Sequence, residues 1–426
     1  MTNKEFDVIV YGATGFTGVL VARYLHQEHE STIGAPNAIK WAIAGRNANK
    51  LQAVKDELKL KVPLVPASMI DAIPVVVADS SNEEQVVDMV LKTKVVLTVV
   101  GPYHFYGEPI VKACAENGVH YCDLSAETLW IERMMQKYEA AAKKTGAILV
   151  NCCGFDSTPS DLTTLLLTDS VKKHNNSGTS KVSICFTELE TGVSGGTFAS
   201  VISTLETSKT KDLLRIRDPY LLTDEKNKAQ KKKDRLARAN KSSIGIKYEK
   251  ELRRWSSFFA GGDINAAIVH RSNYLQNNAY GDKFVYRERM AVGGFFKQIL
   301  MTVGVTFGGI FLYAGPTRAL IKRMLPPPGE GPSEEVMKNG KFIAQGVAYD
   351  DAGAVAACST TIGVGDPFYS MTSKVITETA FCLAKGELAS MDVKNGGFFT
   401  PASAAGVHLA QRLHEKNIMR IDVQAV

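Results

Sequence analysis

The sequence predicts an α/β fold, in which a Rossmann-type, doubly wound parallel sheet is followed by a second α+β domain. Three observations support this prediction. Short β-branched segments alternate with helical ones in the first third of the chain, a glycine-rich loop follows the first of these strands, and strands separated by Gly-rich turns prevail after about residue 180. A chain of 426 residues also exceeds what a single core normally organises.

The first domain is expected to repeat the order strand, helix, strand, which is typical of a doubly wound sheet. Its strands are expected at residues 6–11, 40–44, 74–78, 95–100, 120–123 and 147–151. Its helices are expected at residues 15–26, 49–58, 109–117 and 131–144. Because parallel strands end at the same edge of a sheet, the loops that follow them should together form the binding site.

The remainder of the chain is predicted to form an α+β domain and closing helices. Strands are expected at 182–189, 283–291 and 341–350, and helices at 197–209, 373–385 and 400–414. The predicted boundaries are a dinucleotide-binding domain over 1–160, an α+β domain over 161–372, and C-terminal helices over 373–426 that pack back on either domain.

Composition describes a folded protein and excludes several functional classes. Hydrophobic residues make up 45% and charged residues 22% of the chain. A net charge of +6 is compatible with an anionic cofactor or an acidic membrane surface and does not by itself indicate nucleic acid, so no nucleic-acid partner is expected. The seven cysteines lack zinc-ligand spacing, which favours buried free thiols and no metal site. No secretory leader precedes the first strand, which favours the cytosolic side.

The most informative motif is a glycine loop between a strand and a helix, the context in which such a motif binds a dinucleotide. It reads Gly12-Ala13-Thr14-Gly15-Phe16-Thr17-Gly18. Gly12 permits a tight turn, Gly15 lets the backbone approach the pyrophosphate, and Gly18 lets the helix lie close to the sheet. Backbone amides at the start of the helix then face the phosphate charge. A bare strand-to-helix turn is the alternative interpretation.

The end of the second strand favours NADP over NAD, although NAD remains an alternative. This segment contains Arg46 and no Asp or Glu that could bind a ribose 2′-hydroxyl. A guanidinium binds a 2′-phosphate through forked, charge-assisted hydrogen bonds. Asp79, after the third strand, either lies near the adenine or caps a helix. Gly101 and Pro102, after the fourth strand, are expected to border the nicotinamide-side ribose.

Several stretches of the sequence share the pattern of one oxidoreductase family: Tyr11–Gly18, Val100–Tyr103, Tyr106–Pro109, Tyr121–Glu127, Gly154–Asp161 and Ser194–Thr197. Nearly end to end, the chain resembles the saccharopine dehydrogenase-like oxidoreductases of animals and, more distantly, the mycobacterial trans-acting enoyl reductases. The resemblance implies association with lipid droplets and membranes, and the bacterial relatives imply reduction of a lipid-like double bond. No cluster of arginines suits an amino-dicarboxylate, so the resemblance does not imply saccharopine as the substrate.

Catalytic groups are expected among the polar residues that follow the strands. Tyr-x-x-x-Lys, the arrangement of short-chain reductases, is absent from the sequence. We nominate Tyr103, Tyr106 and Asp156 as catalytic candidates, because a reductase often needs a proton donor near the atom that accepts the hydride. His104, Asp123, Glu127 and Ser157 belong to the same group of strand-end residues.

Each of these candidates also has a purely structural interpretation. Tyr103 and Tyr106 could only pack and bond a backbone group. Asp156 and Asp161 could only cap the next helix. His104 could be an ordinary histidine of a surface loop. The sequence leaves these alternatives open.

An uncharged apolar segment over 298–317 is predicted to contact a membrane or lipid droplet. A buried core or dimer-interface helix is the first alternative. A membrane-spanning helix is the second, although the segment is short for that role. The basic stretch 226–241 is interpreted as a solvated helix or as a segment attracted to anionic headgroups.

Together these features predict an NADP-dependent oxidoreductase that acts on a hydrophobic, lipid-like substrate at a membrane or lipid-droplet surface. The protein would lie on the cytosolic side of that surface, or otherwise in the cytoplasm. A homodimer is left open. The alternative function is a non-catalytic, lipid-associated protein that retains a nucleotide-binding fold.

Overall fold

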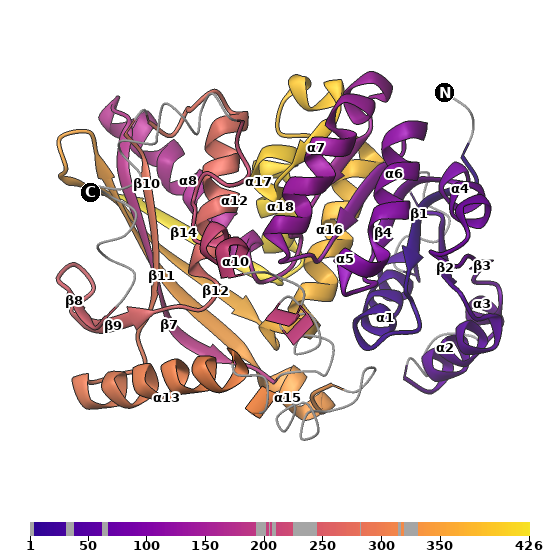
Figure 1. The fold of residues 1–426 in the computed structure, drawn as a ribbon, viewed down its shortest axis with the longest axis horizontal. Coiled ribbons are helices and arrows are strands. Elements are labelled where there is room, and N and C mark those ends of the chain that lie inside the picture. The colour runs from indigo at the N-terminus through magenta and orange to yellow at the C-terminus, as the bar shows by residue number, and fades with distance from the viewer. Residues whose placement is uncertain are drawn as a thin grey trace. The chain divides into compact units, whose positions relative to one another are not determined.

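The computed structural model describes residues 4–30, 38–61, 67–192, 202–203, 205–206, 210–224, 245–281, 283–313, 317–318 and 331–426 (Figure 1). The chain divides into two compact units. The first comprises residues 1–154, 328–331 and 369–409, and the second comprises 155–327, 332–368 and 410–426. Each unit is therefore built from segments that are far apart in the sequence.

The first unit contains a parallel sheet in the order β13-β6-β5-β4-β1-β2-β3. Its strands are β1 (Phe6–Tyr11), β2 (Trp41–Gly45), β3 (Val75–Val77), β4 (Thr93–Thr98), β5 (His120–Asp123), β6 (Ile148–Val150) and β13 (Gly397–Phe399). The strand order reverses between β1 and β4, which is where ligands bind in folds of this kind. The predicted doubly wound sheet is confirmed.

Helices cover both faces of this sheet, so its central strands are apolar along most of their length. The helices are α1 (Phe16–Glu30), α2 (Ala48–Lys61), α3 (Ala67–Asp71), α4 (Glu83–Leu91), α5 (Tyr103–Tyr106), α6 (Glu108–Asn117), α7 (Thr128–Thr145), α16 (Thr372–Lys385) and α17 (Pro401–Ala404). Val8 and Val10 of β1 and Ile43 of β2 are fully buried in a core that also contains Val21 of α1 and Ile376 of α16.

The first unit is completed by residues from the C-terminal part of the chain. Strand β13 pairs with β6 and adds a seventh strand that the sequence did not predict. Helix α16 packs against α1, and the Tyr24 hydroxyl donates a buried hydrogen bond of 2.6 Å to the Glu378 carboxylate. The expected helix over 400–414 is two helices, α17 and α18 (Gly406–Glu415), separated by Ala405.

The second unit contains a mixed sheet in the order β14-β12-β11-β7-β10-β9-β8. Its strands are β7 (Thr179–Glu190), β8 (Lys247–Glu249), β9 (Arg254–Phe258), β10 (Val285–Met290), β11 (Lys341–Asp350), β12 (Val355–Val364) and β14 (Met419–Ala425). The β7–β10 pair is parallel and the other pairs are antiparallel. This arrangement confirms the predicted α+β character.

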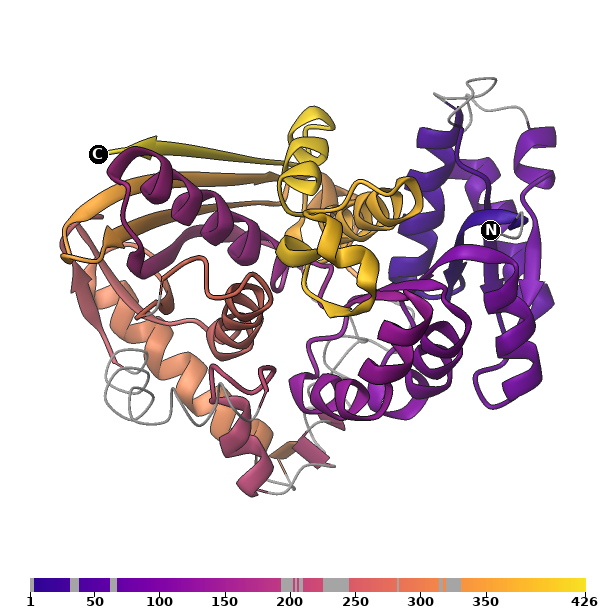
Figure 2. The same cartoon turned by 90° about the horizontal axis from the view of Figure 1, so that it is seen from above.

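One face of the second sheet is covered by α8 (Thr158–Asn175) and α12 (Gly262–Leu275). In Figure 2, α8 (purple) runs along the sheet. Within the described residues, this unit also contains α10 (Thr210–Ile216), α13 (Phe295–Tyr313) and α15 (Glu334–Asn339). Most of the expected helix over 197–209, and all of the basic stretch 226–241, lie outside the described residues.

Candidate cofactor and substrate site

The glycine loop follows β1 and leads into α1, and two of its glycines are required by the fold itself. Gly12 has a φ of +92°, and a Cβ there would lie 2.5 Å from Val100 Cγ2. A Cβ on Gly18 would overlap the carbonyl oxygen of Gly12. Both positions therefore need glycine before any ligand is considered.

Gly15 differs from the other two glycines of the loop. The nearest atom to a Cβ at this position would be the Gly12 carbonyl oxygen at 3.5 Å, which is an ordinary contact. Gly15 is exposed at the amino end of α1, where backbone amides and the helix dipole favour an anion. Because Gly15 has no side chain, the space beside its backbone is open where a pyrophosphate would bind. The loop therefore fits a dinucleotide.

The rest of the loop is held by packing within the first unit. Ala13 is buried, Thr14 is exposed, and Phe16 and Thr17 are half-buried. The ring of Phe16 packs edge to face on Tyr369, with 5.4 Å between the ring centroids. This contact fixes the first turn of α1 and hence the direction of its amides.

Arg46 and Asp79 follow the neighbouring strands β2 and β3. The Arg46 side chain is exposed and lies close enough to Asp79 to lower the pKa of that carboxyl, although the larger cause is hydrogen bonding from Ser81. The Ser81 amide and hydroxyl donate to Asp79 Oδ1 at 2.9 and 2.8 Å. Asn82, which accepts from the Gln85 amide at 3.1 Å, is the residue that caps α4. Asp79 therefore does not cap this helix.

Replacing Arg46 with alanine should reduce the preference for NADPH over NADH by roughly ten- to a hundredfold, because one charge-assisted hydrogen bond contributes about 1.5–3 kcal/mol. Titration of both nucleotides by fluorescence measures the effect. NADH affinity should stay unchanged, which distinguishes a lost phosphate contact from general damage to the site. Equal affinities of the parent protein for the two nucleotides would rule out this role for Arg46.

The end of β4 leads through Gly101 and Pro102 into the short helix α5. The carboxylate of Glu127, a residue that follows β5, accepts hydrogen bonds from the backbone amides of Tyr103 and His104 at 2.8 and 2.9 Å. His104 Nδ1 lies 2.7 Å from the same carboxylate. The sequence placed His104 and Glu127 among the strand-end residues but gave no sign that they pair.

Tyr103 is buried, and its hydroxyl bridges two strand ends. It donates to the Thr98 carbonyl oxygen at 3.1 Å and accepts from the Leu124 amide at 3.0 Å. Burial raises the pKa of Tyr103 well above its ordinary value. These contacts match the structural interpretation of Tyr103. Tyr106, at the other end of α5, is exposed, and the described residues provide no hydrogen-bond partner for its hydroxyl.

Asp123 organises the ends of β5 and β6 from inside the first unit. Its buried carboxylate accepts from the Tyr121 hydroxyl at 2.8 Å, the Asn151 side chain at 2.7 Å, and the backbone amides of Ser125 and Cys152 at 3.0 Å each. Burial raises the pKa of Asp123 to about 6. A carboxylate with this many donors positions the loops after the two strands.

Asp156 belongs to the second unit and precedes α8. Its side chain is exposed, yet desolvation raises its pKa to about 6. A carboxylate that is accessible to solvent but surrounded by much protein accounts for both properties. The N-cap position of α8 is occupied by Ser157, whose hydroxyl donates to Asn265 at 2.8 Å, and Asp161 accepts from Ser272 at 2.5 Å. Neither aspartate caps this helix.

A buried polar cluster lies next to Asp156 in the sequence. Glu288 of β10 accepts from Ser160, from the Tyr286 hydroxyl at 3.0 Å and from the Asn265 side chain at 2.8 Å. Burial raises the pKa of Glu288 to about 7. Both carboxylate oxygens are satisfied, so the cluster ties α8 and α12 to the sheet. Among the described residues, no three His, Cys, Asp or Glu side chains gather as a metal site would require.

Comparison with known proteins agrees with these features. Residues 8–150 match the model of the saccharopine dehydrogenase NADP-binding domain. The chain is 31% identical over 430 residues to a trans-acting enoyl reductase of Mycobacterium tuberculosis, a match that covers 96% of each protein. It is 30% identical over 438 residues to the trans-acting enoyl reductase of Mycobacterium ulcerans, covering 98% of this chain and 97% of the relative.

A solved structure supports the fold. Apo saccharopine dehydrogenase (L-Glu forming) from Saccharomyces cerevisiae matches with a TM-score of 0.51 over 99% of this chain and 100% of the other. Identity is only 10%, so this likeness concerns the architecture alone.

Proposed function

Because the chain belongs to the family of the trans-acting enoyl reductases, within the saccharopine dehydrogenase-like oxidoreductases, we propose that it reduces a hydrophobic, lipid-like substrate at a membrane or lipid-droplet surface. It is an NADP-dependent oxidoreductase by family. The substrate class and the surface are our proposal, and the observation that carries them is the exposed apolar face of α13.

Bound NADP would supply hydride chemistry at its nicotinamide ring. We assign its pyrophosphate to the open backbone at Gly15 and its 2′-phosphate to Arg46, with Asp79 near the adenosine. Gly101 and Pro102 would border the ribose on the nicotinamide side. Tyr106 and Asp156, whose side chains are exposed, remain candidates for contact with the substrate, whereas the bonded hydroxyl of Tyr103 suits a positioning role.

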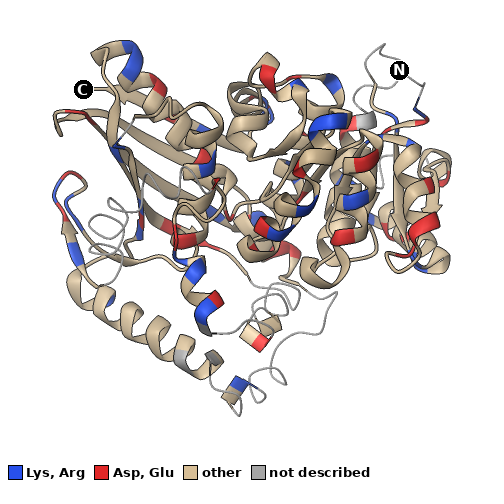
Figure 3. Ribbon diagram, turned by 45° about the horizontal axis from the view of Figure 1, so that its top comes forward, with Lys and Arg blue, Asp and Glu red and all other residues tan. Residues whose placement is uncertain are grey.

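Helix α13 presents a continuous apolar stripe to solvent. Phe296 is 83% exposed, Leu300 75% and Phe307 56%, and Val303 and Phe311 are exposed as well. Spacings of four, three, four and four residues place these side chains on one face of the helix. Figure 3 shows α13 nearly free of charged residues along its length. Large contiguous apolar patches on a protein surface mark interaction sites.

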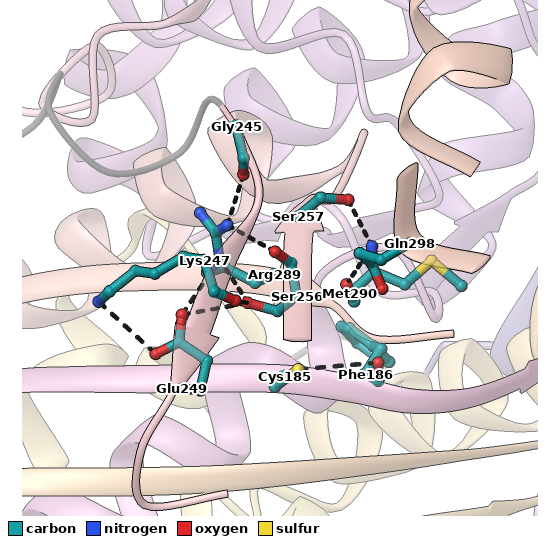
Figure 4. Close-up of polar contacts among 10 residues, drawn as sticks. All are labelled: Cys185, Phe186, Gly245, Lys247, Glu249, Ser256, Ser257, Arg289, Met290 and Gln298. Carbon is teal, nitrogen blue, oxygen red and sulfur yellow. Dashed lines mark hydrogen bonds and ion pairs between the residues drawn. The ribbon is translucent and has the colours of Figure 1, made fainter. Parts of the chain in front are cut away.

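The amino end of α13 is fixed to the sheet. The buried Gln298 side chain donates to Ser257 Oγ at 2.6 Å and to the Met290 carbonyl oxygen at 3.1 Å, and it accepts from the Val292 amide at 3.0 Å. The contacts with Ser257 and Met290, shown in Figure 4, tie α13 to β9 and β10. The helix is therefore held in place while its stripe faces outward.

Beside Gln298, a second network holds the hairpin formed by β8 and β9. The buried Arg289 guanidinium donates to Ser256 Oγ at 2.7 Å and to the Gly245 carbonyl oxygen at 2.7 Å, and it lies 3.2 Å from Glu249 (Figure 4). The ring of Trp255 in β9 packs against Phe295 at the start of α13, with 4.7 Å between centroids. The hairpin thereby supports the same end of the helix.

These observations bear on the alternatives for the segment 298–317, which are a buried core or dimer-interface helix and a membrane-spanning helix. Gln298 is buried, but residues 303–309 and Phe311 are exposed, which favours a surface helix over a buried core helix. Within the described residues, no helix has the length and apolarity that crossing a membrane requires. An exposed apolar helix that rests in the lipid interface is the interpretation that we propose.

The proposed activity predicts that the protein consumes NADPH when it is supplied with a total lipid extract. Mass spectrometry should find a lipid product that is two hydrogen atoms heavier than its precursor. The Gly15→Val variant, which should not bind the cofactor, is the matched control. Nucleotide binding without any consumption of NADPH would favour the non-catalytic alternative.

A further inference from the structure

A row of four aromatic rings joins the hairpin of β8 and β9 to helix α13. The rings of Tyr248 and Trp255 pack edge to face, with 5.2 Å between their centroids. Trp255 packs on Phe295 at 4.7 Å, and Phe295 packs on Phe296 at 5.8 Å. Trp255 is half-buried and the other three rings are exposed. Because Phe296 begins the apolar stripe of α13, the hairpin and the stripe form one continuous surface, which we term the hairpin–helix surface.

The rings of this row change from polar to apolar along its length. Tyr248 carries a hydroxyl and Trp255 an indole N–H, whereas Phe295 and Phe296 carry no polar atom. Tyrosine and tryptophan favour the headgroup level of a bilayer, where one end of the ring is wet and the other is apolar. Phenylalanine suits the apolar side of the same boundary. The order of ring types therefore matches the passage from headgroups to hydrocarbon.

Basic side chains surround the polar end of the row. Lys250 and Arg253 in the turn and Arg254 at the start of β9 are exposed, and none of them forms an ion pair with another described residue. Lys297, in the first turn of α13, is exposed as well. The helix dipole opposes a cation at this position, so the stability of α13 does not explain it. In Figure 3, the hairpin carries Lys and Arg (blue) beside the charge-poor α13.

The two acidic residues of the hairpin are engaged by the second unit. Glu249 is buried and lies 3.2 Å from the Arg289 guanidinium (Figure 4). Glu251 accepts a hydrogen bond from the Tyr349 hydroxyl of β11. The charge that the hairpin presents to solvent is therefore mainly positive, next to an apolar stripe.

We propose that the hairpin–helix surface binds a bilayer that contains anionic phospholipids, with Lys250, Arg253 and Arg254 at the headgroups. This inference rests on the proposed function, because it assigns the headgroup chemistry of the lipid surface named there. Attachment to a bilayer strengthens with buried apolar area and with attraction between basic side chains and anionic headgroups. An uncharged bilayer satisfies only the apolar part of this surface, so the protein should prefer anionic lipid.

The first test compares flotation with vesicles of phosphatidylcholine alone and with vesicles that also contain phosphatidylserine. Each basic residue close to an anionic surface strengthens binding by about fivefold. The triple variant Lys250→Gln, Arg253→Gln and Arg254→Gln should therefore bind the mixed vesicles roughly 100-fold more weakly. Its binding to phosphatidylcholine vesicles should stay unchanged. Flotation over a range of lipid concentrations measures both affinities, and a melting curve verifies the fold.

The matched control removes the same charge from other helices. Lys92, Lys144 and Lys172 are exposed at the carboxyl ends of α4, α7 and α8. Replacing these three lysines with glutamine should leave binding to the mixed vesicles nearly unchanged. An equal loss in the two triple variants would show that net charge sets the preference, which would overturn the role of the hairpin.

The second test locates the hairpin on the parent protein and needs no variant to fold. The chain contains three tryptophans, of which Trp41 and Trp130 are buried and Trp255 is half-buried. Phospholipids with brominated acyl chains quench the fluorescence of a tryptophan that contacts them. Mixed vesicles of brominated lipid should quench Trp255, and Trp255→Phe should remove this quenching. A parent protein that floats with these vesicles without any quenching would place the hairpin away from the lipid and overturn the proposal.

The outcomes distinguish this inference from the proposed function. If the parent protein floats with neither kind of vesicle, the lipid-surface proposal fails and this inference fails with it. If it floats equally with both kinds, the apolar stripe is sufficient and only the role of the basic hairpin is wrong. A parent dimer that Phe296→Asp dissociates in sedimentation experiments would assign the surface to a second copy of the chain and overturn the proposal.

Discussion

Replacing Gly15 with valine is expected to abolish NADPH binding, weakening it by at least about 100-fold, while the protein remains folded. A Cβ added at Gly15 would lie 3.5 Å from its nearest neighbour, the Gly12 carbonyl oxygen. The first unit therefore tolerates a side chain there. A bound pyrophosphate does not, because the side chain would occupy its space. Fluorescence titration with NADPH, together with a melting curve, measures both properties.

Gly18→Ala is the instructive counterpart to Gly15→Val. A methyl group at Gly18 would overlap the Gly12 carbonyl oxygen. This variant should therefore have a lower melting temperature and also bind NADPH more weakly. Within one loop, Gly15 is therefore expected to be needed for nucleotide binding and Gly18 for folding. Normal NADPH affinity in a folded Gly15→Val variant would show that this loop does not hold the phosphates.

The second large effect is expected on α13. Exchanging both Phe307 and Phe311 for aspartate should release the protein from lipid vesicles while NADPH affinity is retained. Each phenylalanine buried in lipid contributes up to about 1.5–3 kcal/mol to the free energy of vesicle binding. Losing both should therefore weaken vesicle binding by about 100-fold or more. Flotation with phosphatidylcholine vesicles, with and without phosphatidylserine, measures the binding.

The matched control for α13 is an exposed apolar residue elsewhere. Leu60 at the end of α2 is 80% exposed, and Leu60→Asp should leave vesicle binding intact. A parent protein that does not float with vesicles of either composition would contradict the lipid-surface proposal. An insoluble double variant would instead indicate that the two phenylalanines support the fold. The melting curve of each variant distinguishes these results.

The fold of the first unit was predictable because its strands carry continuous apolar segments and its loop glycines have a physical reason for their spacing. Strand β13 was not predictable, because a three-residue strand has no periodicity of its own and is defined only by pairing with β6. The sequence also could not separate α17 from α18, since their boundary depends on the local backbone at Ala405.

The candidate site was only partly visible in the sequence. The cofactor loop could be read from local spacing, but the pairing of His104 with Glu127 joins residues that meet only because β4 and β5 are neighbours in the sheet. Exposure of α13 was equally hidden, because a buried helix and a lipid-facing helix have the same apolar composition. Both the His104–Glu127 pair and the exposure of α13 depend on contacts between residues far apart in the sequence.

The return of the chain to complete the first unit has a consequence for synthesis. Residues 1–154 leave the ribosome first, yet the edge of their sheet needs β13, and α1 needs α16 and the hydrogen bond from Tyr24 to Glu378. Domains usually fold in the order in which they are translated. Here the nucleotide-binding unit stays unfinished until residues 369–409 have emerged, so a nascent chain that ends before them exposes part of that core.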